Sequence, residues 1–152
     1  MILIVPTALI SSAVMASPAQ AAAPTTVQLQ SDILKLTNQA RVKNGCPALR
    51  LDANLAKAAR NHSAWMAGNR TMSHVGAGGS TFVNRAQAAG YNSAMSENVA
   101  WGYRTGVTVV NALMKSPGHR ANILNCKAKA IGIGAAYAAN GNPYYTQDFG
   151  SK

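Results

Sequence analysis

Histidine and glutamate are rare in this sequence, which contains three histidines and a single glutamate. His74 lies in a glycine-rich stretch, Glu97 in a short polar stretch, and His119 just after a helix break at Pro117. These residues come from three separate segments, each near the end of an expected element, where binding sites are often built. The third histidine, His62, falls on the apolar side of an expected helix, so we interpret it as a hydrogen-bonded core residue.

Two imidazoles and one carboxylate would suit a divalent metal ion if folding brings His74, Glu97 and His119 together. Three protein ligands with one open position resemble a catalytic zinc site more than a closed structural one. The same ligands suit nickel and copper, so the set predicts Zn²⁺ or another divalent metal without selecting one. Spacing alone does not separate such a site from three unrelated polar residues.

A hydrolase would need a nucleophile or a base, and no familiar motif supplies either. The sequence contains neither G-x-S-x-G nor H-E-x-x-H. Ser73, Ser96 and Ser116 lie close in sequence to the candidate ligands and are expected beside the cleft. If the protein is a metal-assisted hydrolase, Glu97 or a bound water is the candidate base.

A mechanism with two carboxylates is not expected from the sequence. The possible partners of Glu97 are Asp32, Asp52 and Asp148. Asp32 and Asp52 are better explained as residues at helix starts, and Asp148 lies in the last expected strand.

The N-terminus has the pattern of an export signal. Residues 1–16 are mostly apolar, no charged residue precedes Asp32, and small residues then dominate. We expect a signal peptide over residues 1–21, with cleavage after Ala21 or Ala23. The alternative is a membrane anchor, but the interrupted apolar run is shorter than the roughly 20 residues a spanning helix needs. The sequence therefore predicts a secreted protein without a transmembrane segment.

Cys46 and Cys126 are the only cysteines. In an oxidising compartment a distant pair of this kind usually forms one disulfide, and the alternative is two buried free thiols. The net charge of +10 predicts attraction to anionic lipid or to an anionic polymer of the cell envelope. Nucleic acid is not an expected partner, because the basic residues are spread along the chain without a cluster of aromatic residues. No oligomeric state is predicted.

Periodicity and turn residues divide the chain into helices followed by a hairpin. Residues 22–30 are expected to form a linker and residues 31–152 a single domain. The expected helices cover residues 31–45, 52–68, 80–89, 107–115 and 117–123. The expected strands cover residues 96–101, 130–137 and 144–149, with a turn at 140–142. This order favours an α+β fold in which helices pack against an antiparallel sheet.

Several motifs, in order along the chain, resemble those of the bacterial branch of the CAP superfamily of cysteine-rich secretory, antigen 5 and pathogenesis-related proteins. They are LTNQARVKNGCPALRLDANLAKAARNHSAWMA at 36–67, SHVGAGGSTFVNRAQAAGY at 73–91, SENVAWG at 96–102, SPGHRANIL at 116–124 and YYTQDFG at 144–150. The resemblance implies a three-layer α/β/α sandwich with a central antiparallel sheet, the CAP or SCP fold. It also implies a cleft in which His74, Glu97 and His119 bind a divalent metal, and a cysteine pair seen in many bacterial members.

Two departures from the family pattern weaken the implied metal site. Leu113 and Ser116 stand where many animal and plant members carry a tryptophan and a second cleft glutamate. Ser96 replaces the usual glycine before Glu97. We therefore expect a secreted binding module for lipid or anionic envelope polymer, with a weak metal cleft. The alternatives are a metal-assisted hydrolase (a protease or esterase) and a wall-associated structural protein held by charge.

Overall fold

Four strands form one sheet in the order β1-β3-β4-β2. They are β1 (Arg50–Leu51), β2 (Ala94–Trp101), β3 (Ala130–Tyr137) and β4 (Pro143–Gly150). β2, β3 and β4 are antiparallel, as predicted, whereas the short β1 joins the edge of β3 in a parallel direction through two residues. The hairpin of β3 and β4 therefore occupies the centre of the sheet.

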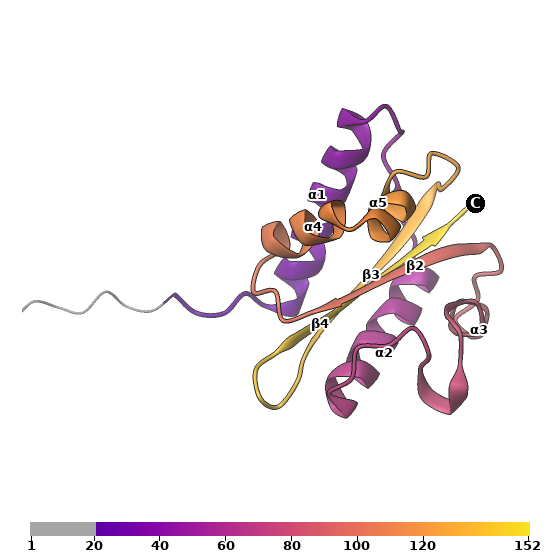
Figure 1. Ribbon diagram of the computed structural model, residues 1–152. Helices are drawn as coiled ribbons and strands as arrows, with labels where there is room; N and C mark the ends of the chain where they lie inside the picture. The colour runs from indigo at the N-terminus through magenta and orange to yellow at the C-terminus, as the bar shows by residue number, and fades with distance from the viewer. Residues whose placement is uncertain (1–20) are drawn as a thin grey trace, which may run out of the picture.

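Helices cover both faces of this sheet in the computed structural model, which describes residues 21–152 (Figure 1). One face carries α1 (Thr26–Lys43), α4 (Gly106–Lys115) and α5 (Pro117–Ile123). The other carries α2 (Ala53–Asn69) and α3 (Phe82–Ala88), with a 3-10 turn, η1 (Ala77–Gly79), before α3. The predicted α+β class and three-layer sandwich are confirmed.

The predicted signal peptide, residues 1–21, lies outside the described residues apart from Ala21. Within residues 21–152, none of the helices combines the length and the apolar character needed to traverse a bilayer.

The predicted start of the first helix at residue 31 was wrong, and most of the expected linker, residues 22–30, is helical. α1 begins at Thr26, because Thr25 and Gln28 form a reciprocal capping box. Leu29 is fully buried and extends the apolar stripe one turn toward the N-terminus. The later caps lie nearer to expectation: Asp52 caps α2 as predicted, and Thr81 rather than Ser80 caps α3.

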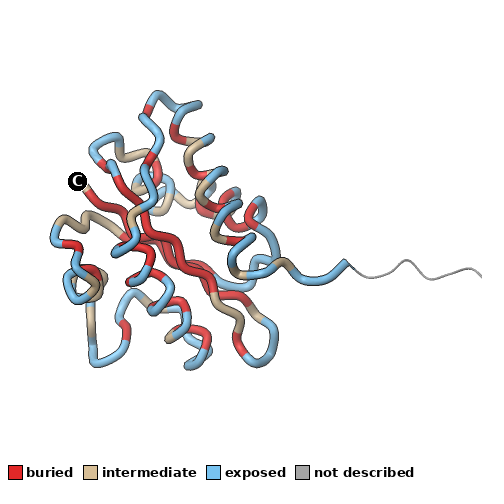
Figure 2. The backbone as a smooth tube through the Cα atoms, turned by 180° about the vertical axis from the view of Figure 1, so that it is seen from behind, coloured by how far each residue is buried: buried red, intermediate tan, exposed pale blue. Residues whose placement is uncertain are grey.

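Two glycines let α2 approach the sheet closely. A Cβ atom added to Gly132 would lie 2.1 Å from the backbone of Leu55, and one added to Gly134 would lie 2.1 Å from the backbone of Ala59. The alternating Gly132 and Gly134 therefore fix how near α2 lies to β3, while Ile131 and Ile133 point into the core on the opposite face. The strands form a continuous buried band between the two helical layers (Figure 2).

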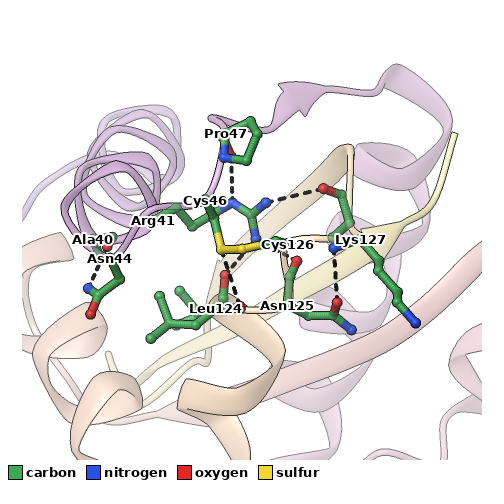
Figure 3. Close-up of a disulfide and its surroundings, with 11 residues drawn as sticks. Ala40, Arg41, Asn44, Cys46, Pro47, Leu124, Asn125, Cys126 and Lys127 are labelled. Carbon is green, nitrogen blue, oxygen red and sulfur yellow. Dashed lines mark hydrogen bonds between the residues drawn. A yellow bond between two sulfur atoms is a disulfide. The ribbon is translucent and has the colours of Figure 1, made fainter.

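The predicted disulfide joins Cys46, just after α1, to Cys126, just after α5 (Figure 3). Beside it lies Arg41, which is fully buried and has no acidic partner in the described chain. Its guanidinium donates to four backbone carbonyls at 2.7–3.1 Å, those of Pro47, Ile123, Asn125 and Ala128. Burial lowers the pKa of Arg41, but the four carbonyl dipoles solvate its charge. Arg41 and the disulfide together fix the end of α1 to the segment that leads into β3.

Candidate functional site

Glu97 lies on β2 with its side chain almost fully buried, at 1% exposure. Its two carboxylate oxygens have different partners. Oε1 accepts from Nδ1 of His74 at 2.8 Å, and Oε2 accepts from the guanidinium of Arg85 at 2.5 Å. Because a carboxylate only accepts, Nδ1 of the half-exposed His74 ring is the donor in this bond.

Arg85 on α3 also holds the glycine-rich loop in place. Its Nη1 donates to the carbonyls of His74 at 3.1 Å and Ser80 at 2.7 Å, while Nη2 binds Glu97. One guanidinium therefore connects both ends of the loop to β2. Sequence reasoning did not single out Arg85, because nothing in the periodicity of α3 distinguishes it from an exposed arginine.

Asp148 on β4 is directly opposite Glu97 in the register of β2 and β4. It is fully buried, and no donor group of the described residues reaches its carboxyl oxygens, so the hydrogen bond open to a protonated Asp148 is the one to Glu97. Burial raises the pKa of Asp148 well above its usual range, the charge of Glu97 raises it further, and Arg85 opposes the shift. Asp148 was named from the sequence as a possible partner of Glu97 but was not expected to act with it; strand register places the two residues side by side.

His62 on α2 is a buried residue that supports the loop, as predicted. Its Nε2 lies 2.7 Å from the carbonyl of Ser73 and donates to it, and its ring stacks on Trp65. Burial lowers the pKa of His62, and the charge of Arg85 lowers it further. A Cβ atom at Gly76 would lie 2.9 Å from Nδ1 of His62, so the loop passes close to the ring.

Buried amides connect α5 to the strands beside Glu97. Asn98 Nδ2 donates to the carbonyl of His119 and to Oε1 of Gln147, both at 3.1 Å. Asn122 Nδ2 donates to the carbonyl of Glu97 at 3.2 Å and to Oδ1 of Asn98 at 2.8 Å. These bonds set the position of His119 relative to Glu97 and show why asparagines belong in both motifs.

His119 borders an apolar cavity of about 190 Å³. The cavity lies between β2, the loop after it, α4 and α5, and its lining is Met72, Val99, Ala100, Trp101, Tyr103, Ala112, Leu113, Ser116 and His119. Burial lowers the pKa of His119, and the neighbouring His74 lowers it further, so the neutral imidazole is favoured.

Of the three expected metal ligands, the structure brings His74 and Glu97 into contact. Within residues 21–152, no group of three His, Cys, Asp or Glu side chains is placed to hold an ion. His74 meets Glu97, but His119 faces the apolar cavity, and both Glu97 oxygens already have partners. The Arg85 charge on Glu97 also opposes a second cation there. As placed, the three side chains do not form an ion site together, and metal binding by His74, Glu97 and His119 stays a prediction.

The three cleft-adjacent serines have separate environments. Ser116 lines the apolar cavity. Ser73 Oγ accepts from the N–H of Val75 at 3.0 Å, and its carbonyl accepts from His62. Ser96 Oγ is buried with no partner in the described part of the chain.

Comparisons with known proteins show the family to which this chain is similar. The model of the cysteine-rich secretory protein family, CAP, matches residues 34–149. YkwD, an uncharacterized protein of Bacillus subtilis, is 37% identical over 130 residues, which are 84% of this chain and 49% of that relative. This chain therefore spans about half the length of YkwD.

Solved structures share the fold. An extracellular protein of Bacillus anthracis with an SCP domain aligns at a TM-score of 0.75 and 30% identity, over 84% of this chain and 41% of that chain. An outer surface protein of Borrelia burgdorferi aligns at 0.73 and 23% identity, over 84% of this chain and 98% of that one. With the family match over most of its length, the chain belongs to the cysteine-rich secretory protein family, CAP.

Proposed function

We propose that this chain is exported and binds an anionic lipid, inserting part of the apolar chain into the cavity beside His119. The disulfide and the extracellular or surface description of the two aligned structures support export. The observation that carries the proposal is the apolar lining of the cavity in a protein whose net charge is +10.

The size and rim of the cavity suit part of a lipid rather than a whole ligand. Its volume of about 190 Å³ is below the roughly 300–1,000 Å³ of sites that enclose a drug-sized molecule. Met72, Trp101 and Tyr103 line it while remaining 47%, 48% and 39% exposed. These side chains offer apolar surface that a bound chain would cover.

Charge near the cavity suits an anionic headgroup. Arg104, Lys115 and Arg120 are exposed and are sequence neighbours of lining residues. A wall polymer of sugars and phosphates would use the same charge but would gain little from the apolar lining. The cavity therefore favours lipid over polymer, and over retention by charge alone.

Filling the cavity tests the proposal. Ala112 lines it, whereas Asn111 is the exposed neighbouring residue of α4. We expect Ala112→Phe to weaken binding of monomeric dodecyl phosphate by about tenfold or more, and Asn111→Phe to leave it unchanged. Trp101 fluorescence follows binding, because Trp101 lines the cavity.

Two further probes separate the alternatives. Inorganic phosphate should bind far more weakly than dodecyl phosphate, and dodecyl phosphate should remain bound at moderate salt. If Ala112→Phe and Asn111→Phe bind dodecyl phosphate equally well, or if salt abolishes binding in every variant, the results would favour a wall-associated protein held by charge alone. Hydrolysis of an ester or peptide panel that Glu97→Gln abolishes would instead favour the hydrolase alternative.

A further inference from the structure

Among residues 21–152, no strand covers most of the outer edge of β3. β1 pairs only with Ala130 and Ile131, and Asp52 makes the last contact by donating its N–H to the carbonyl of Ile131 at 3.0 Å. The chain then turns into α2. Because β3 is regular, the backbone groups of Ile133 and Ala135 point to the same side as those of Ile131.

These backbone groups are unpaired within the described residues. Neither N–H nor C=O of Ile133 or Ala135 has a partner on the β1 side. Both residues are nevertheless buried, at 2% and 7% exposure. Donors and acceptors in such a position require water or another chain, since a buried unpaired backbone group is costly.

A groove of about 520 Å³ lies along this edge, between α1 and α2. Its lining includes Val27, Leu34, Leu51, Arg60 and Ile133. Val27 and Leu51 are 74% and 56% exposed, so the groove contains two of the large apolar side chains that the fold leaves uncovered. It lies at the β1 side of the sheet, away from the cavity beside β2.

We propose that this groove binds an extended peptide segment as an added strand on β3, with apolar residues alternating with acidic ones. The unpaired edge selects an extended backbone, which supplies the missing hydrogen bonds. Alternate side chains of an added strand point to opposite faces. The apolar side chains of the peptide would contact Val27 and Leu34 of α1. The acidic side chains would contact α2, where Arg60 is the charged lining residue.

A short capped peptide of alternating valine and glutamate is the probe. Binding should slow the amide exchange of Ile133 and Ala135 by about tenfold or more, as measured by NMR on the full chain. The same peptide with methylated backbone nitrogens on its bonding edge should not bind. Ala135→Pro, which removes one outward N–H at an edge position that accepts proline, should weaken binding while circular dichroism stays native.

Charge reversal tests the acidic preference. The Arg60→Glu variant should no longer bind the valine–glutamate peptide and should bind a valine–lysine peptide instead. Lys57 is exposed on the same helix but lies outside the groove, so Lys57→Glu should not change which peptide binds. Equal binding of the methylated peptide would overturn strand addition, as would the absence of binding by either peptide. Concentration-dependent dimerisation that Arg60→Glu abolishes would assign the groove to a second copy of the chain instead.

Discussion

Glu97 on β2 and Asp148 on β4 stand directly opposite each other, so two carboxyl groups share one face of the sheet inside the protein. Glu97 has the donors Arg85 and His74 as partners, whereas no donor of the described chain reaches Asp148, whose neighbour is Glu97 itself. The pair is therefore asymmetric, and the protonated form of Asp148 is favoured.

Asp148→Asn should remove a pH dependence of stability. The raised pKa means that native Asp148 keeps its proton above about pH 4, where the unfolded chain loses it. Wild-type stability should therefore fall with rising pH through this window, because the folded state binds more protons there. The variant should gain stability relative to wild type as pH rises, and the two should converge near pH 4. Urea unfolding between pH 4 and 8 measures this, with the exposed Asp32→Asn as control; parallel curves for wild type and Asp148→Asn would contradict it.

Arg85→Gln should increase the affinity for zinc. The substitution removes a positive charge from Glu97, and we expect roughly tenfold tighter binding by calorimetry. Arg85→Lys keeps the charge and should resemble wild type. Tight zinc binding by wild type that both His74→Ala and His119→Ala abolish would instead establish the three-ligand site expected from the sequence.

Arg41→Leu should lower the free energy of unfolding by about 3–5 kcal/mol, because four buried carbonyls lose a charged donor. Arg41→Lys should recover only part of the loss, since an ammonium group cannot reproduce the planar fork. The exposed Lys43→Leu on the same helix should change stability by less than about 0.5 kcal/mol. Leaving one buried polar group unsatisfied costs about 1–3 kcal/mol. A loss of stability below about 1 kcal/mol in Arg41→Leu would therefore contradict this account.

Gly134→Ala should destabilise the protein by about 1–3 kcal/mol or more, because the new Cβ would overlap the backbone of α2 at Ala59. Gly118→Ala is the matched control, since nothing lies within 4 Å of its added Cβ and alanine favours α5. Thermal unfolding compares the two variants. If Gly134→Ala does not change the stability, α2 is not held as close to β3 as the contact between Gly134 and Ala59 requires.

Local sequence signals predicted much of the fold. The limits of β3 followed from its apolar run and the turn at 140–142, and Asp52 was correctly identified as a helix cap. The start of α1 was missed because residues 22–30 contain little apolar periodicity. The capping box of Thr25 and Gln28 and the buried Leu29 were the available signals.

The candidate site was only partly predictable for a different reason. The motifs identified His74, Glu97 and His119, but not which atoms would meet. The packing of α3 brings Arg85 to Glu97, and the register of β2 and β4 brings Asp148 to it. Neither the packing nor the register can be predicted from the residues next to Glu97 in the sequence. A lone acid inside the aromatic run of β4 was the one signal that could have identified Asp148.

The covalent ring closed by Cys46 and Cys126 spans 80 residues but omits β3 and β4, the two central strands of the sheet. During synthesis both sulfurs therefore emerge before β3 and β4, the hairpin around which the rest of the domain packs. Oxidation can in principle precede completion of the core, so formation of this bond does not by itself report a mature protein. A chain that ends just after residue 126 would keep the disulfide but lack β3 and β4, the central strands of the sheet.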